Sequence, residues 1–183
     1  QLSFSQNEAV DSLQNLLKHV KQDSTRLKIY VELCEICDTE DILKYGVPAV
    51  TLAENRLKGL SQNNPLWKFY LTELSVATNN IGFYNMDHGN IDIALKCYNK
   101  CLKNYELLDN KEGMATALIN LGFFHDNEGS IAQALNFYHK ALKIYSQINS
   151  LPGIAAVQNN IAAIYSNHGN IQKALDYYHR SLK

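Results

Sequence analysis

The sequence predicts an all-α fold, a solenoid built from antiparallel helix pairs. Three observations favour this fold. A stretch from Ala117 to Lys143 reappears forty residues earlier and forty residues later, apolar residues recur within each copy at helical spacing, and a glycine separates the two halves of each copy. Helical segments that repeat at a fixed period, and that cannot bury their apolar faces alone, are typical of stacked repeat proteins.

The first half of each copy is predicted to be a helix with one buried face, here called helix A. Its apolar side chains recur at positions i, i+4 and i+7, which places them on one side of a helix. The three sets are Ala77, Ile81 and Tyr84; Ala117, Leu121 and Phe124; and Val157, Ile161 and Ile164. Each helix A is predicted to end at Gly89, Gly129 or Gly169, because glycine readily adopts a positive φ.

The second half of each copy is predicted to be helix B, with Asn90, Ser130 or Asn170 as its N-cap residue. Its inner stripe occurs three times: Ile91, Leu95, Tyr98 and Leu102; Ile131, Leu135, Tyr138 and Leu142; Ile171, Leu175, Tyr178 and Leu182. Where helices A and B approach closely, larger side chains would force them apart. The small residues expected at these contacts are Gly82, Gly122 and Ala162 in helix A and Ala94, Ala134 and Ala174 in helix B.

These positions resemble the motif of the tetratricopeptide repeat family, which has Gly or Ala in helix A, Ala early in helix B, an aromatic residue four positions later and a small residue three further on. The second copy reads Gly122, Ala134, Tyr138 and Ala141, and its neighbours read Gly82, Ala94, Tyr98 and Cys101, and Ala162, Ala174, Tyr178 and Ser181. Two features depart from the family pattern. The aromatic residue expected early in helix A is Thr78, Leu118 or Gln158, and the repeat exceeds the usual length of about 34 residues. The resemblance implies a right-handed superhelix; it is strong over residues 68–183 and weak before them.

The predicted organisation has five segments. Residues 1–22 form an N-terminal capping helix, which Ser5 and Glu8 would begin as a capping box. Residues 23–64 form a degenerate helix pair, with helices at about 25–37 and 40–58, a turn at 38–41, and Pro48 kinking or delaying the second helix. Residues 65–110 and 111–150 form complete repeats, the first starting with Pro65 at the first position of a long helix A. Residues 151–183 form a repeat truncated at its end.

Composition and motifs argue against several classes of function. The formal net charge of −1 disfavours a nucleic-acid surface, and no run of about 20 apolar residues is present to insert into a membrane. Catalytic motifs and phosphate-binding loops are absent. Cys34-x-x-Cys37 and Cys97-x-x-x-Cys101 lie in predicted helices, which favours ordinary packing over zinc or dithiol chemistry. His139 and His179 are expected on the outer surface. The sequence therefore predicts a non-enzymatic protein with no metal ion and no cofactor.

A second stripe on helix A is the candidate binding surface, because its residues at i, i+3 and i+7 share one face. The stripe consists of Asn80, Phe83 and Asp87; Asn120, Phe123 and Asn127; and Asn160, Ala163 and Asn167. Resemblance to peptide-binding tetratricopeptide repeats implies that this face lines a concave groove and contacts a peptide or protein segment. An asparagine amide both donates and accepts, so it can pair with a peptide backbone of any sequence. The alternative is that these amides bond to a neighbouring helix backbone.

The resemblance also raises expectations about context. Its architecture is similar to the N-terminal sensory or interaction region of larger bacterial signalling proteins, whose output is a histidine kinase, a cyclase or a transcription regulator. Because the chain starts with Gln1 and stops within a repeat, it is expected to be the trimmed front part of a longer protein. A periplasmic or extracytoplasmic location is expected, with the cytoplasm as the alternative. The competing functions are a cytoplasmic receptor for peptide pheromones and a scaffold that forms a homodimer through Ile161, Ile164 and Leu175.

Overall fold

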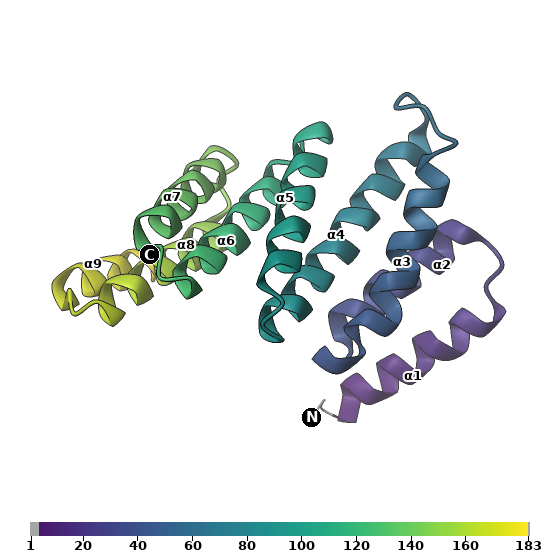
Figure 1. The fold of residues 1–183 in the computed structure, drawn as a ribbon, viewed down its shortest axis with the longest axis horizontal. Helices are drawn as coiled ribbons and strands as arrows, with labels where there is room; N and C mark the ends of the chain where they lie inside the picture. The colour runs from purple at the N-terminus through teal and green to yellow at the C-terminus, as the bar shows by residue number, and fades with distance from the viewer. Residues whose placement is uncertain (1–3, 183) are drawn as a thin grey trace. The chain divides into compact units, whose positions relative to one another are not determined.

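The computed structural model describes residues 4–182, with side chains from residue 6 onward, and these residues are almost entirely helical (Figure 1). Nine α-helices and one 3-10 helix make up the described part: α1 (Phe4–His19), α2 (Asp23–Ile36), η1 (Thr39–Asp41), α3 (Ile42–Leu57), α4 (Pro65–Asp87), α5 (Ile91–Leu107), α6 (Lys111–Asn127), α7 (Ile131–Gln147), α8 (Leu151–Asn167) and α9 (Ile171–Ser181). The predicted all-α solenoid class, built from helix pairs, is confirmed.

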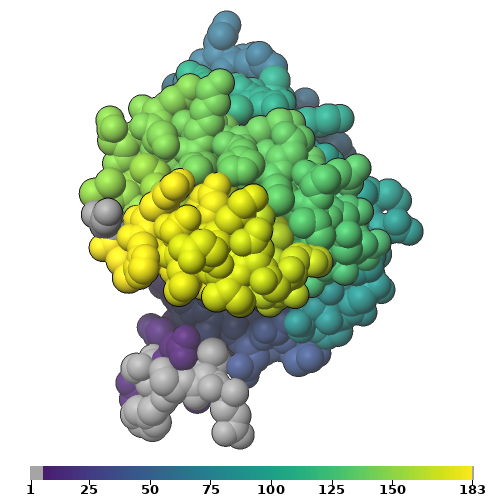
Figure 2. Space-filling view, turned by 90° about the vertical axis from the view of Figure 1, so that its left-hand side faces the viewer, coloured from purple at the N-terminus to yellow at the C-terminus, as the bar shows by residue number. Residues whose placement is uncertain are grey.

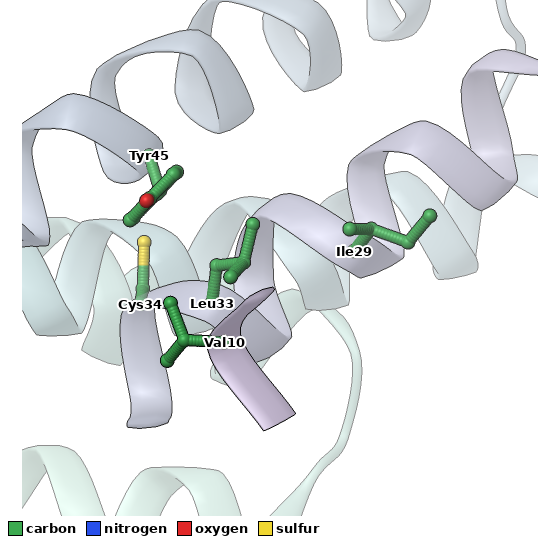
Figure 3. Close-up of a cluster of buried hydrophobic side chains, with 5 residues drawn as sticks. All are labelled: Val10, Ile29, Leu33, Cys34 and Tyr45. Carbon is green, nitrogen blue, oxygen red and sulfur yellow. The ribbon is translucent and has the colours of Figure 1, made fainter. Parts of the chain in front are cut away.

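The chain forms two compact units, residues 1–104 (unit 1) and 105–183 (unit 2), with the boundary inside α5. In unit 1, α2 packs against α1, α3 and α4. Its core includes Val10 from α1, Leu33 and Cys34 from α2, and Tyr45 from α3 (Figure 3). Gln14 Nε2 donates a hydrogen bond to the Tyr45 hydroxyl at 2.7 Å, so α1 is held by polar as well as apolar contacts. The predicted capping box depends on the side chain of Ser5, which lies outside the described side chains.

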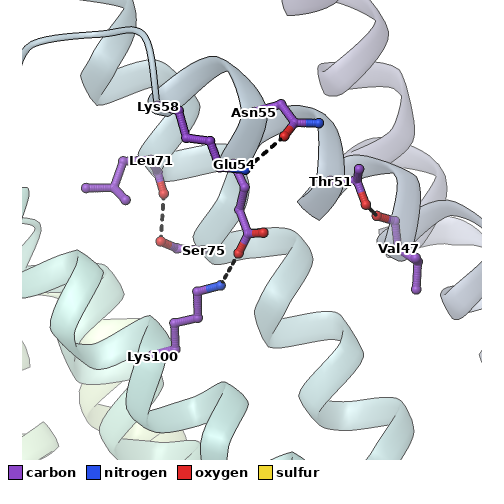
Figure 4. Close-up of polar contacts among 8 residues, drawn as sticks. All are labelled: Val47, Thr51, Glu54, Asn55, Lys58, Leu71, Ser75 and Lys100. Atoms are coloured by element: carbon purple, nitrogen blue, oxygen red, sulfur yellow. Dashed lines mark hydrogen bonds and ion pairs between the residues drawn. The ribbon is translucent and has the colours of Figure 1, made fainter.

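The degenerate pair predicted at residues 23–64 corresponds to α2 and α3, with η1 in place of the predicted turn. Pro48 does not delay α3, which begins at Ile42 and continues helically through the proline. Figure 4 shows polar contacts at α3 and within α4, together with one that joins α3 to α5. Among them, Lys100 Nζ of α5 lies 2.6 Å from Glu54 Oε1 of α3. This ion pair is partly exposed, so we expect it to contribute only about 0–1 kcal/mol.

The helix ends that the structure describes follow their predicted local signals. Each helix A ends just before a glycine of positive φ, which is 72° at Gly89, 71° at Gly129 and 75° at Gly169. Asn170 caps α9 by accepting a hydrogen bond from Lys173 N at 3.2 Å. Ser130 is the N-cap residue of α7, as predicted, although its side chain makes no capping hydrogen bond. There, the turn is held by backbone bonds instead, including Ser130 N to His125 O at 2.8 Å.

Close contacts between helices A and B occur where small residues were predicted. A Cβ added to Gly82 would lie 2.8 Å from Tyr98 Cε1, and one added to Gly122 would lie 2.7 Å from Tyr138 Cε1. Ala94 and Ala134, on the facing helices, are fully buried. The small residues therefore allow each helix A to pack directly on the aromatic ring of its own helix B.

The predicted self-association surface needs correction. Ile161 and Ile164 are 0% and 1% exposed, so they cannot contact a second copy, whereas Leu175 is 46% exposed. The reason is that α8 packs against both α7 and α9, which together cover its apolar stripe. Among the described residues, the exposed apolar side chains of unit 2 therefore include Leu175 but neither isoleucine.

Candidate functional site

In unit 1, the candidate stripe lies on the C-terminal half of α4. Asn80 is half-buried, and its Nδ2 has no hydrogen-bond partner among the described residues. One turn later, the Phe83 side chain is 50% exposed. Asp87 is exposed at the last position of α4. The structure thus places a buried amide nitrogen without a described partner one turn before an exposed aromatic ring.

In unit 2, the same stripe occurs on α6 and again on α8. Asn120 and Asn160 are half-buried, as Asn80 is, and Phe123 is 46% exposed. Asn127 is exposed, and its Nδ2 donates to Phe123 O of its own helix at 3.1 Å. On α8 the stripe ends in Asn167, which is exposed, and has no aromatic residue because Ala163 takes that position. The amide is therefore repeated on α6 and α8, but the exposed ring is present only on α6.

The two helices of unit 2 that carry the candidate stripe, α6 and α8, contain few charged residues. Helix α8 contains no Asp, Glu, Lys or Arg at all, and in α6 these residues occur only close to the two ends. Interactions with this surface must therefore rely on hydrogen bonds and apolar contact. Such contacts depend much less on ionic strength than ion pairs do.

A contact that the sequence did not reveal lies next to Asp87, at the end of α4. The imidazole ring of His88 stacks on Tyr84 with 4.0 Å between centroids, and its Nδ1 lies 2.8 Å from Tyr84 O. Its Nε2 lies 3.4 Å from Glu40 Oε1 of the 3-10 helix η1. The hydrogen bond to Tyr84 O, followed by the nearby carboxylate of Glu40, raises the pKa of His88 above 6.5.

We expect His88 to make the stability of unit 1 depend on pH. Because its folded pKa is raised, its stabilising effect should be complete below about pH 6.5 and should disappear as the pH rises through the folded value. His88→Gln keeps a donor for Tyr84 O but cannot titrate. The free energy of unfolding, measured with urea, should therefore differ more between this variant and the wild type in acid than in alkali. A difference that stays constant with pH would contradict the assignment, and Glu40→Gln should reduce the pH dependence only in part.

The four cysteines are free thiols, and Cys34 and Cys101 are buried. Burial, with a smaller effect from neighbouring groups, raises the pKa of each of these two thiols to about 12. Cys101 fills the position that Ala141 occupies in the next repeat, and both are fully buried. The packing interpretation therefore fits these two residues. Within residues 4–182, no group of three or more His, Cys, Asp or Glu side chains could hold a metal ion.

Two other predictions concern surfaces. His139 and His179 are exposed, as expected for residues on the outer side of helix B. Across the described part of the chain, no helix combines the length and apolarity needed to cross a membrane.

Solved structures with the same fold include several repeat proteins. Aspartyl phosphate phosphatase F from Bacillus subtilis matches with a TM-score of 0.78 and 16% identity over 98% of this chain and 48% of that one. A Rap protein complexed with competence and sporulation factor gives 0.74 and 17% identity, over 97% and 48% of the two chains. BtubC (BKLC) from P. vanneervenii gives 0.69 and 18% identity, over 97% and 70%. The chain thus spans about half the length of the first two proteins, and at these identities the similarity concerns the fold alone.

Sequence comparison identifies the family directly. No curated protein matches the sequence. The family described as tetratricopeptide repeat matches residues 73–147 and again residues 113–183, which together cover more than half of the chain. This family match supports a protein-binding module, and such repeats are in general not catalytic. The chain belongs to the tetratricopeptide repeat family.

Proposed function

We propose that the protein binds an extended peptide or protein segment along the helix-A stripe. The observation that carries the proposal is the recurrence, in both units, of an exposed phenylalanine one turn after a half-buried asparagine, at Phe83 and Phe123. An exposed aromatic ring that recurs at equivalent positions of the repeat can supply the apolar contact of a binding surface. The neighbouring amide can then bond to the backbone of the bound segment.

The available contacts suggest how much of the binding free energy the phenylalanines supply and how much the asparagines supply. Burying a phenylalanine side chain contributes about 1.5–3 kcal/mol, and a hydrogen bond contributes a net of about 0.5–1.5 kcal/mol. The rings would then supply most of the affinity, while the asparagines set the register of the bound backbone. Since the stripe helices of unit 2 are almost uncharged, the ligand is proposed to be a neutral, partly apolar segment.

The biological setting is part of the proposal. We propose that the chain is the N-terminal sensory or interaction region of a larger bacterial signalling protein, in a periplasmic or extracytoplasmic location, because its repeat pattern resembles such regions. The second candidate is a cytoplasmic receptor for a peptide signal. It is favoured by the fold shared with the Rap protein that was crystallised with competence and sporulation factor. A homodimer remains the third candidate.

The test uses peptides selected from a phage-displayed random library against the intact chain. Binding of a selected, labelled peptide is measured by fluorescence anisotropy for the wild type and for a variant with Asn80→Ala, Asn120→Ala and Asn160→Ala. We expect affinity to fall by about tenfold or more, which is the loss of about 1.4 kcal/mol. Binding by the wild type should change little between low and high salt.

The matched control is Asn99→Ala. Asn99 is an exposed asparagine on α5 whose Nδ2 donates only to Leu95 O of its own helix, among the described contacts. This variant should bind as the wild type does. Equal affinity of the triple variant and the wild type, with both folded by circular dichroism, would overturn the proposal. The proposed contribution of the two phenylalanine rings to affinity is tested by measuring peptide binding for Phe83→Ala and Phe123→Ala.

A further inference from the structure

Unit 1 contains an open cleft between α2 and α3, here called the α2–α3 cleft. Its volume is about 390 Å³, close to the lower end of the range for ligand cavities, about 300–1,000 Å³. Only residues of α2 and α3 line it, whereas the candidate stripe of unit 1 lies on α4. The lining includes Arg26, Tyr30, Val47, Pro48, Leu52 and Asn55. A cleft of this size suits a small group or the end of a chain.

Arg26 gives the cleft a positive charge that no described carboxylate neutralises. Its guanidinium is anchored by a hydrogen bond from Nη2 to Val20 O at 2.8 Å. The carboxylate one turn earlier, Asp23, is already bound by Arg56, whose Nε donates to Asp23 Oδ2 at 2.6 Å. None of the residues that line the cleft is acidic. Because a guanidinium presents its N–H donors as a fork that fits a carboxylate, a carboxylate is the ligand group that Arg26 favours.

The rest of the cleft is partly apolar. Val47 is 51% exposed, and Pro48, Leu52 and Tyr30 are half-buried. These side chains can be covered by an aliphatic group of a ligand, which would remove apolar surface from water. The ligand is therefore expected to carry its carboxylate on an apolar body.

Two polar side chains of α3 supply one acceptor and one donor, as Figure 4 shows. The Thr51 hydroxyl donates to Val47 O at 2.9 Å, so its oxygen can only accept a further bond. Asn55 Oδ1 accepts from Lys58 Nζ at 3.3 Å, which leaves Nδ2 as the donor of this amide among the described contacts. A peptide unit offers the complementary pair, an N–H and a C=O, whereas a simple fatty acid offers neither.

The cleft also has a neighbour along α3. A smaller hollow of about 230 Å³ shares Asn55 with it and is lined by Leu60 and Leu66, at the two ends of the α3–α4 loop. This loop is the blue segment at the top of Figure 2. Leu66 is 48% exposed, so the hollow has an apolar surface for a further side chain. Two adjoining hollows suit consecutive residues of one chain.

We propose that the α2–α3 cleft binds the C-terminal residue of a peptide or protein partner. Arg26 would hold the terminal carboxylate, an aliphatic side chain would cover Val47, Pro48 and Leu52, and Thr51 Oγ1 would accept the last backbone N–H. The preceding residue would lie toward Leu66. This site recognises a charged chain end, in contrast to the neutral segment proposed for the helix-A stripe.

The probe is acetyl-Ala-Leu-Leu with a free C-terminal carboxylate, titrated into the intact ¹⁵N-labelled chain and followed by the shifts of backbone amide signals in NMR spectra. We expect saturable shifts at residues that line the cleft, including Arg26, Tyr30, Thr51, Leu52 and Asn55. The same peptide with a C-terminal amide should bind about tenfold more weakly or less, because it lacks the charge that pairs with Arg26. Octanoate, which has the carboxylate but no peptide unit, should also bind about tenfold more weakly or less.

Variants of the chain isolate the cleft. Arg26→Gln is expected to weaken binding of the acid by about tenfold or more. Val47→Asp changes an exposed side chain, so the fold should persist, and its carboxylate should compete with the ligand and cause a similar loss. The matched control is Lys28→Gln, which removes the same charge from an exposed position of α2 outside the cleft and should change binding by less than about twofold.

Three results would overturn the proposal: no shifts in the cleft of the wild type, equal binding of the acid and the amide, or equal binding by Arg26→Gln with its fold intact by circular dichroism. Octanoate binding as tightly as the peptide would also overturn it, because the ligand would then be a free apolar acid. The variant with all three helix-A asparagines replaced by alanine should bind acetyl-Ala-Leu-Leu normally. Failure of the proposed function and failure of this inference are thereby distinguished.

Discussion

Gly153→Ala is expected to lower the free energy of unfolding of unit 2 by about 2 kcal/mol, within the range found for overpacked cores. A Cβ at this position would lie 2.3 Å from Tyr145 Cδ1 and 2.4 Å from Tyr145 Cε1. The ring cannot easily move away, because Tyr145 is buried and its hydroxyl lies 3.2 Å from Thr116 Oγ1. The higher helix propensity of alanine, about 1 kcal/mol in a helix interior, would offset only part of this cost.

A double-mutant cycle tests this explanation. Urea unfolding is measured for the wild type, Gly153→Ala, Tyr145→Ala and the double variant. If the clash with the ring causes the loss, Gly153→Ala should cost nothing once Tyr145 is truncated, giving a large coupling between the two sites. An unchanged cost in the Tyr145→Ala background would point instead to the backbone of α8. Gly113, where a Cβ would lie 2.3 Å from Tyr105 Cδ1, should behave in the same way.

The helices and their ends were predictable because their signals are local. Gly89, Gly129 and Gly169 end three helices by positive φ, and Pro65 begins α4 with Asn64 Oδ1 accepting from Leu66 N at 2.9 Å. Helical periodicity also predicted which residues of the candidate stripe share a face. What bonds to each asparagine could not be predicted, since hydrogen-bond partners depend on side-chain conformation and on neighbouring helices.

The structural features that the sequence did not predict are contacts between separate helices. Gly113 and Gly153 each follow a tyrosine by eight positions, and this repeated spacing was a signal that went unused. The pairing of His88 with Glu40 joins segments far apart in the chain and left no such pattern. The stripe of α8 was recognised correctly as apolar, but periodicity does not say which stripe a neighbour covers. For that reason Ile161 was predicted at a surface although it is fully buried.

Tyr138→Ala and Tyr178→Ala form a matched pair in which the same residue of the repeat differs only in its surroundings. Tyr138 is 1% exposed and rests on Gly122, so its truncation should cost about 3–5 kcal/mol, as for other large aromatic side chains in cores. Tyr178 is 38% exposed on α9, and its truncation should cost less than half as much. Thermal or urea unfolding of the two variants measures both values. Equal costs would contradict the difference in burial between the two tyrosines.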